Sequence, residues 1–292
     1  MMKQVRPKKN LGQHFLTDLS IAKRIADTVD TPYPDLPVLE VGPGMGVMTQ
    51  YLVEKPRPLK VVEIDRESVA YLKETLFKEE TGDGRQERIV EGDFLRMDLR
   101  QVFDGQQFVL TGNYPYDISS QIFFKMLDNR DLIPCCTGMI QHEVAVRMAS
   151  QPGNKQYGIL SVLIQAWYNV EYLFTVEPSV FNPPPKVQSA VIRMTRNEVQ
   201  HLGCDEQLFK RVVKTVFNQR RKMLRVSLKQ LLPNEALSAL NSQLSSQRHT
   251  LKERTLNSQL SLTLRPEQLS IAQFVELTNL VEEALSVSKE EV

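Results

Sequence analysis

The sequence VLEVGPGMG at residues 38–46 decides the fold that we expect for this chain. Its first four residues are mostly apolar and predict a buried strand, and the three alternate glycines predict a tight turn into a helix after Gly46. Such a turn lets the backbone approach a ligand closely. The spacing G-x-G-x-G differs from that of dinucleotide folds, and no Gly-Lys-Ser/Thr follows, which disfavours nucleoside triphosphates. A simple turn without a ligand is the alternative for this motif alone.

Strands and helices alternate on the C-terminal side of this turn. Strands are predicted at residues 60–65, 88–93 and 107–113, and helices at residues 67–78 and 118–127. Later strands are expected near residues 137–141, 167–175 and 190–194. This alternation is typical of an open, mostly parallel α/β sheet, which binds ligands outside the carboxyl ends of its strands.

Two further segments indicate the domain organisation. Before the sheet, Thr17 or Asp18 can cap a helix that runs to about Val29. After about residue 196, apolar residues recur at helical spacing. We therefore expect an α/β domain at residues 1–198 and a small all-α domain at residues 199–292.

Acidic residues end two of the predicted strands that follow the glycine turn. Glu63 lies 21 residues after Gly42 and can accept hydrogen bonds from both hydroxyls of a ribose. Asp93 is placed to accept from an adenine amine, and Phe94 beside it could cover the ring. Each acid alone is more often a surface or capping residue. Together with the motif after the fourth strand, they predict a nucleoside bound across adjacent strand ends. This order resembles the class I S-adenosylmethionine methyltransferase fold.

The motif NYPY at residues 113–116 is the most specific one. It resembles the Asn/Asp-Pro-Pro-Tyr motif of methyltransferases that modify exocyclic amines of bases. The Asn113 side-chain carbonyl and the Pro115 backbone carbonyl can accept the protons of an adenine amine, which frees the nitrogen lone pair for attack on a methyl group. Tyr116 can stack on the flipped base, an interaction of roughly 1–3 kcal/mol. A proline turn with core tyrosines is the alternative.

The composition excludes several classes of protein. The chain has 292 residues, of which 41% are hydrophobic and 24% charged, as in ordinary globular proteins. Its three cysteines form no Cys-x-x-Cys or Cys/His cluster, so we expect neither a disulfide framework nor a metal site. No run approaches the ~18 apolar residues of a membrane span, and the basic N-terminus lacks the apolar region of a signal peptide. We expect a soluble, cytoplasmic monomer.

The net charge of +1 hides an uneven distribution of charge. Residues 1–24 carry a balance of +5 and residues 205–230 one of +6, whereas residues 63–98 carry −5 and residues 276–292 carry −4. Within the second basic segment, four cations lie within six residues, and we expect them to contact RNA phosphates: Arg220, Arg221, Lys222 and Arg225. A solvated helix face is the alternative.

Four segments resemble the small-subunit ribosomal RNA adenine dimethyltransferases, the kasugamycin-sensitivity methyltransferase family. They are LGQHFL at residues 11–16, NYPYDIS at 113–119, FNPPPKVQSAVIRM at 181–194 and FNQRRKMLRVSL at 217–228. The resemblance runs from about residue 6 to about residue 285. It implies a Rossmann-like class I methyltransferase domain followed by a small helical domain. It also implies two successive methylations, by S-adenosylmethionine, of each of two adjacent adenines near the 3′ end of 16S rRNA. The implied substrate is an assembling small subunit, and a role in ribosome biogenesis follows.

The resemblance also assigns roles to individual residues. The implied S-adenosylmethionine contacts are His14, Leu16, Gly42, Glu63, Asp93 and Asn113, with Gly44 lining the turn. Phe181 is implied as the second aromatic residue at the target base. The family usually has Leu where Tyr114 stands and Asn where Asp117 stands. The first departure should matter little if Tyr114 points away from the base, and the second adds a negative charge near it.

Two rival functions stay open on the sequence. The first is the related large-subunit rRNA adenine methyltransferase that confers macrolide resistance, which shares the glycine-rich and Asn-x-Pro-Tyr motifs. FNQRRKMLR and the start GQHFL favour the small-subunit enzyme. The second is a non-catalytic RNA-binding or assembly factor, which the complete set of Glu63, Asp93 and residues 113–116 argues against as the sole role.

Overall fold

The VLEV segment forms the third strand of a seven-stranded sheet in the computed structural model of the chain, which describes residue 8 and residues 13–78, 88–250 and 260–290. In sheet order the strands are β4 (Ile89–Glu91), β3 (Leu59–Glu63), β2 (Val38–Val41), β5 (Val109–Thr111), β6 (Cys135–Gln141), β9 (Ser189–Arg196) and β7 (Tyr168–Val176). The first five run parallel, and β9 is antiparallel to both of its neighbours. The expected open, mostly parallel sheet is therefore present.

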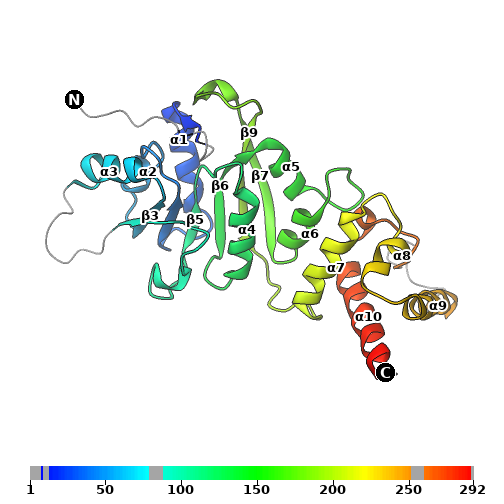
Figure 1. Ribbon diagram of the computed structural model, residues 1–292. Helices are drawn as coiled ribbons and strands as arrows, with labels where there is room; N and C mark the ends of the chain where they lie inside the picture. The colour runs from blue at the N-terminus through cyan, green and yellow to red at the C-terminus, as the bar shows by residue number, and fades with distance from the viewer. Residues whose placement is uncertain (1–7, 9–12, 79–87, 251–259, 291–292) are drawn as a thin grey trace. The chain divides into compact units, whose positions relative to one another are not determined.

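The path of the chain leaves a crevice in the middle of this sheet. From β2 the chain adds β3 and β4 towards one edge and then returns to β5 on the other side of β2. Figure 1 labels β3, β5 and β6, which follow one another across the sheet in that order. The connections that leave β2 and β5 therefore diverge at their carboxyl ends. Open α/β sheets bind their ligands at this point of reversal.

Helices and short helical turns connect the strands. They are α1 (Leu19–Ala26), η2 (Asp27–Asp30), α2 (Thr49–Leu52), α3 (Arg66–Thr75), η4 (Leu99–Gln101), α4 (Ser119–Asp128), α5 (His142–Ala149) and η5 (Pro178–Val180). Asp18, rather than Thr17, caps α1, because its carboxylate accepts the backbone N–H groups of Ser20 and Ile21 at 2.9 and 3.2 Å. The helix ends before Val29, where η2 continues the chain as a tighter turn.

A second, two-stranded sheet joins segments that are distant in sequence. β1 (Phe15–Leu16) pairs antiparallel with β8 (Phe181–Asn182), with Leu16 opposite Phe181. Both of these side chains are buried in the apolar core. The backbone N–H of Thr17 extends the pairing to the Val180 carbonyl at 2.8 Å. This sheet fixes the segment that precedes α1.

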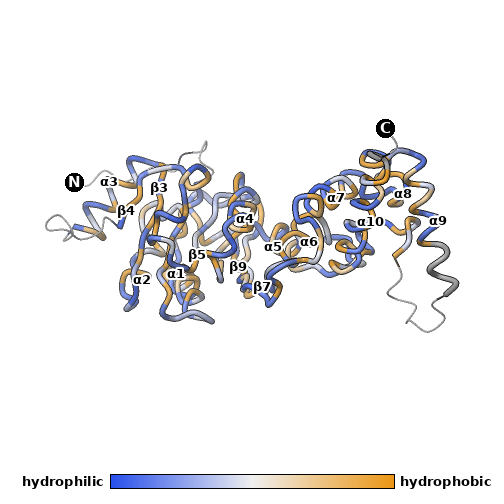
Figure 2. The backbone as a smooth tube through the Cα atoms, turned by 90° about the horizontal axis from the view of Figure 1, so that it is seen from below, coloured by the Kyte–Doolittle hydropathy of each residue, from blue (hydrophilic) through white to orange (hydrophobic). Residues whose placement is uncertain are grey.

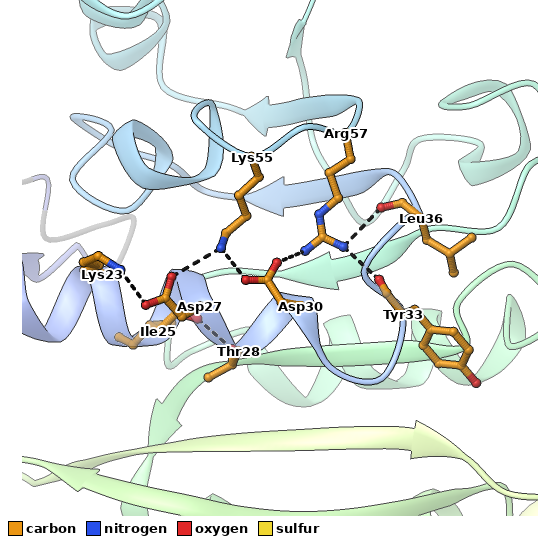
Figure 3. Close-up of polar contacts among 9 residues, drawn as sticks. All are labelled: Lys23, Ile25, Asp27, Thr28, Asp30, Tyr33, Leu36, Lys55 and Arg57. Atoms are coloured by element: carbon orange, nitrogen blue, oxygen red, sulfur yellow. Dashed lines mark hydrogen bonds and ion pairs between the residues drawn. The ribbon is translucent and has the colours of Figure 1, made fainter.

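A network of charged residues fixes the loops that enter β2 and β3 (Figure 3). The buried Arg57 guanidinium donates to Asp30 at 2.7 Å and to the Tyr33 and Leu36 carbonyls at 2.8 and 3.3 Å. Lys55 bonds the same Asp30 carboxylate at 2.6 Å. These bonds hold the amino-terminal side of the sheet, opposite the strand ends that carry the predicted site.

The chain divides into two compact units, Met1–Val146 with Tyr168–Asn197, and Arg147–Trp167 with Glu198–Val292. The second unit contains the end of α5 together with α6 (Ile159–Gln165), α7 (Glu206–Asn218), α8 (Leu224–Ser227), η6 (Leu228–Gln230), α9 (Asn234–Thr250), η7 (Pro266–Gln268) and α10 (Ile271–Glu290). The expected division into residues 1–198 and 199–292 does not contain the insertion at 147–167. Packing explains why this insertion belongs to the second unit, since the Trp167 ring meets the Phe209 ring of that unit edge to face, with 6.0 Å between centroids.

The second unit is helical throughout the part that the structure describes, as the sequence predicted. Hydrophobic and hydrophilic residues alternate along α7 and α10 (Figure 2). The Phe217 ring of α7 stacks on the Phe274 ring of α10 at 5.8 Å between centroids. Among the described residues, no helix combines the length and the apolar character that a membrane crossing requires.

Candidate active site

A cavity of about 290 Å³ lies at the carboxyl ends of β2, β3, β4 and β5, within the first unit. The loops after these strands form its walls, and β1 contributes a further side. Ten of the residues predicted from the sequence line it: His14, Leu16, Gly42, Gly44, Glu63, Asp93, Phe94, Asn113, Pro115 and Tyr116. The structure therefore brings together nearly all of the predicted methyl-transfer site.

The glycine turn and Glu63 are joined by a hydrogen bond in one wall of this cavity. Gly44 has a φ of +56°, and an added Cβ would lie 3.1 Å from the Phe15 ring, so glycine suits this position in both conformation and size. The Gly44 N–H donates to one oxygen of Glu63 at 3.0 Å, and the N–H groups of Ile64 and Asp65 donate to the other at 2.9 Å each. Burial raises the pKa of Glu63, and these three bonds oppose that shift. The carboxylate is thus held in one orientation and has lone pairs left for a ligand.

Glu40 is a second buried acid in the cavity wall, and the sequence-based prediction did not include it. Its carboxyl accepts the Thr49 hydroxyl at 2.7 Å and is 1% exposed. Burial raises its pKa to about 8, with a further contribution from Glu63. An acid inside the apolar strand VLEV was the available signal, because a carboxyl is rarely buried without a specific reason.

The loop after β4 supplies Asp93 and Phe94. The Asp93 carboxylate accepts the Leu95 N–H at 2.9 Å and lies 3.4 Å from the exposed Arg96 guanidinium. It remains about one-third exposed. Phe94 is 4% exposed and forms part of the cavity wall. A neighbouring wall residue that the sequence did not reveal is Ile64, whose side chain is 53% exposed and could cover a planar ring.

Asn113 is fixed from both its backbone and its side chain. Its segment pairs with β6, through an isolated bridge between Asn113 and Met139. Its side-chain Nδ2 donates to the backbone carbonyl of His14 at 3.2 Å. The amide carbonyl therefore points away from the β1 segment and is left to accept another donor.

Pro115 and Tyr116 follow at the same edge of the cavity. The Pro115 carbonyl accepts the Ile118 N–H at 3.3 Å and keeps a second lone pair. The Tyr116 hydroxyl lies 2.5 Å from Ser189 Oγ, and burial raises the pKa of that phenol. The Tyr116 ring stacks beside the His14 imidazole, with 5.6 Å between centroids and 28° between planes. An aromatic face and two carbonyl acceptors thus meet at one edge of the cavity.

His14 links this edge to the proline-rich loop. Its Nδ1 lies 2.9 Å from the Pro183 carbonyl, an acceptor that requires the N–H on that nitrogen. Its backbone carbonyl is the one that accepts from Asn113. This arrangement agrees with a hydrogen-bonding role for the ring.

Phe181 is the exception among the predicted site residues. We expected it to face the target base, but it does not line the cavity and its side chain is 4% exposed. It packs in the apolar core opposite Leu16. The long-range pairing of β1 with β8 explains the difference, because no local pattern in the sequence reports it.

The two departures from the expected family pattern have different surroundings. The Tyr114 side chain is 1% exposed, donates to the Thr137 carbonyl at 3.0 Å and meets the Phe123 ring edge to face. Gly138 makes room for it, since an added Cβ would lie 2.7 Å from the Tyr114 ring. Asp117 is exposed at the rim of the cavity. Only Asp117 therefore adds charge near the site.

Comparison with known proteins decides the family. The model of the family "Ribosomal RNA adenine dimethylase" matches residues 4–282. Two similar proteins, both named ribosomal RNA small subunit methyltransferase A, come from Bacteroides fragilis and Porphyromonas gingivalis. The first is 62% identical over 100% of this chain and 98% of its own length, and the second is 54% identical over 97% and 100%.

The chain belongs to the ribosomal RNA adenine dimethylase family. This membership confirms the resemblance seen in the sequence, the methyltransferase activity and S-adenosylmethionine as the methyl donor. Two solved structures share the fold. A dimethyladenosine transferase from Plasmodium falciparum has a TM-score of 0.70 at 24% identity, covering 93% of this chain and 98% of its own. The 23S rRNA methyltransferase ErmE has a TM-score of 0.62 at 25% identity, covering 92% and 99%.

The basic run of this dimethylase family member lies in the second unit. The run occupies the turn after α7 and the start of α8, rather than the middle of a helix. Arg221, Lys222 and Arg225 are exposed there. Arg220 differs, since its guanidinium lies 3.9 Å from Glu267 and donates to the Asn154 carbonyl at 3.4 Å. The structure therefore separates three exposed cations from one that also contacts Asn154 and Glu267 of the second unit.

Of the other predicted basic segment, residues 1–24, residues 1–7 and 9–12 lie outside the described residues, and with them three of its six cations: Lys3, Arg6 and Lys9. Lys8 is described, and it bonds Asp65 at 2.5 Å and Glu67 at 3.2 Å. Asp65, two residues after Glu63, caps the N-terminus of α3. Lys8 thus ties the start of the chain to the loop that carries Glu63. No cluster of His, Cys, Asp or Glu that could hold a metal ion occurs in the described part of the chain.

Proposed function

We propose that this chain transfers methyl groups from S-adenosylmethionine to the exocyclic amines of two adjacent adenines near the 3′ end of 16S rRNA in the small ribosomal subunit. The observation that carries the proposal is the position of Asn113. Its amide is held by the His14 carbonyl at the edge of a cavity whose other side carries Glu63 and Asp93. The name of the relatives from Bacteroides fragilis and Porphyromonas gingivalis favours the small subunit over the large one.

The part of the cavity that would bind S-adenosylmethionine has the hydrogen-bond acceptors that this cofactor requires. Glu63 would accept the two ribose hydroxyls, because its three backbone N–H bonds leave lone pairs directed into the cavity. Asp93 would accept the adenine amine, with Phe94 and Ile64 as apolar walls. When bound, the cofactor supplies an electrophilic methyl group on a sulfonium.

The edge of the cavity that carries Asn113, Pro115 and Tyr116 would prepare the nitrogen of the target adenine for attack on the methyl group. The Asn113 carbonyl and the Pro115 carbonyl would accept the two protons of the amine, which draws the nitrogen towards tetrahedral geometry. A neutral amide suits a step in which positive charge develops on that nitrogen. The Tyr116 ring would stack on the flipped base, with the His14 imidazole behind it. In this proposal Phe181 anchors β8 and does not touch the base.

RNA binding in this proposal uses phosphate contacts outside the cavity. Arg221, Lys222 and Arg225 would position the ribosomal RNA without reading its sequence. A near-neutral net charge then predicts weak binding to arbitrary RNA and useful binding only to a structured rRNA surface. We further propose that the chain acts in the cytoplasm, as a monomer, on an assembling small subunit.

Methyl uptake from labelled S-adenosylmethionine tests this proposal. Small and large subunits from cells that lack the methylation are incubated separately with the protein, and their modified nucleosides are identified. We expect dimethyladenosine in the small subunit only. Methylation of the large subunit alone would favour the activity named for ErmE, and uptake into neither would favour a binding factor without catalysis.

A further inference from the structure

Lys125 joins α4 to the loop that carries Asp93 and Phe94. Its Nζ donates to the Leu95 carbonyl at 3.0 Å and to the Met97 carbonyl at 2.5 Å. The same ammonium lies 5.8 Å from the centroid of the Phe94 ring. Burial lowers the pKa of Lys125, and the carboxylates of Asp93 and Asp98 oppose that shift. One side chain thus bonds two carbonyl groups of this loop.

The loop follows the short strand β4, and the backbone N–H of Gly92 at its start donates to the Glu63 carbonyl at 2.9 Å. Within the loop, the backbone N–H groups of Arg96 and Met97 donate to the Asp93 carbonyl at 3.0 and 3.2 Å. These bonds define a turn but do not attach it to the rest of the first unit. Charge-assisted bonds from a lysine to carbonyl oxygens are stronger than neutral ones. Lys125 therefore connects the turn to a helix.

The helix that carries Lys125 also begins at the acceptor motif. α4 starts at Ser119, whose hydroxyl donates to the Tyr116 carbonyl at 3.2 Å. One end of α4 thus holds the predicted target-base site, and its later turns hold the loop at the nucleoside end of the cavity. We infer that Lys125 is a positioning residue that sets the Asp93–Phe94 loop for binding of the methyl donor. The inference rests on the proposed function, because it takes Asp93 and Phe94 as the adenine contacts.

The substitution Lys125→Met tests this inference, since it removes the charge and the donors but keeps an apolar stem. A matched control is Lys60→Met, because Lys60 is also half-buried and its ammonium lies 5.6 Å from a phenylalanine ring, that of Phe103, outside the cavity wall. Affinity for S-adenosylmethionine is measured by calorimetry, and backbone hydrogen exchange is followed at residues 93–98. Steady-state kinetics on small subunits give KM and kcat.

We expect Lys125→Met to bind S-adenosylmethionine roughly 10-fold more weakly, since binding would then have to order a loop residue at a cost of about 1.4 kcal/mol. KM for the cofactor should rise by a similar factor, kcat should stay within about 2-fold, and exchange at residues 93–98 should accelerate. Lys60→Met should change none of these. A purely structural lysine would lower the melting temperature without changing the affinity.

Cofactor affinity within about 2-fold of wild type would overturn the inference, whatever the melting temperature. Should Lys125→Met fail to fold, Lys125→Gln retains a neutral donor and is judged by the same affinity criterion. The variant Glu63→Gln distinguishes a failure of the role of Lys125 from a failure of the proposed function. If Glu63→Gln weakened binding and Lys125→Met did not, only the role of Lys125 would fail, whereas a wild-type protein that bound no cofactor would refute the proposed function itself.

Discussion

The substitution Glu40→Gln should make the stability of this chain less dependent on pH. The Glu40 carboxyl is 1% exposed, and burial raises its pKa from 4.5 to about 8, although the Thr49 hydroxyl opposes the shift. The folded chain therefore retains a proton that the unfolded chain releases near pH 4.5. Glutamine has nearly the same shape and stays neutral at every pH.

The sign of the effect follows from this difference in proton binding. A carboxyl whose pKa is raised on folding contributes stability that is fully present below pH 4.5 and is lost as the pH rises through about 8. At 1.36 kcal/mol per pKa unit, the interval from 4.5 to about 8 corresponds to a loss of about 5 kcal/mol. Glu40→Gln removes this loss. The variant should match wild type near pH 4.5 and exceed its free energy of unfolding increasingly up to about pH 8.

Urea denaturation followed by circular dichroism, over a range of pH values that spans the pKa of about 8, measures this difference. The control Glu74→Gln makes the same chemical change at an exposed position of α3, and it should leave the pH dependence unchanged. A difference in the free energy of unfolding between Glu40→Gln and wild type that stays constant over the whole pH range would contradict this prediction. It would mean that Glu40 ionises in the folded chain as it does in water.

Other substitutions test the cofactor and RNA contacts separately. Glu63→Gln should weaken S-adenosylmethionine binding about 10-fold or more, since a charged hydrogen bond contributes about 1.5–3 kcal/mol, and unchanged affinity in calorimetry would remove Glu63 from the ribose site. Replacing Arg221, Lys222 and Arg225 together by Gln should weaken small-subunit binding. The slope of the logarithm of the binding constant against the logarithm of the salt concentration should become flatter by up to ~0.7–0.9 for each phosphate that the variant no longer neutralises. An unchanged slope would mean that these cations form a solvated surface only. Arg220→Ala should instead lower the free energy of unfolding by roughly 1 kcal/mol in a denaturation experiment, and an undiminished stability would contradict its structural role.

Much of the α/β unit could be predicted because its signals are local. Each parallel strand is a short apolar run, and the glycine, acidic and proline residues that follow these runs mark where the strands end. Because parallel strands share one carboxyl edge, the residues after them meet in space without further information. For this reason the sequence alone suffices to place Gly42, Glu63, Asp93 and Asn113 around one cavity.

The remaining features depend on contacts between distant segments. The sequence suggests that Phe181 faces the target base, yet its pairing with Leu16 holds it in the core. The segment 147–167 lies between two predicted strands of the α/β domain, but it belongs to the second unit, where Trp167 packs against Phe209. Neither pairing leaves a periodic signal in the sequence. Glu40 differs from these two cases, since an acid inside the apolar strand VLEV does signal a buried carboxyl, and the sequence leaves open only that this carboxyl lies beside a cavity.

We expect the Asn113 carbonyl to prepare the adenine amine for methyl transfer, and the rate of dimethyladenosine formation by Asn113→Ala tests this role most directly. The variant is mixed with unmethylated small subunits at saturating S-adenosylmethionine, and the nucleosides are quantified by mass spectrometry at successive times. We predict a rate at least about 100-fold below wild type in a folded protein, as for the loss of one preorganised transition-state contact. Formation of dimethyladenosine at nearly the wild-type rate would show that the Asn113 carbonyl does not prepare the amine.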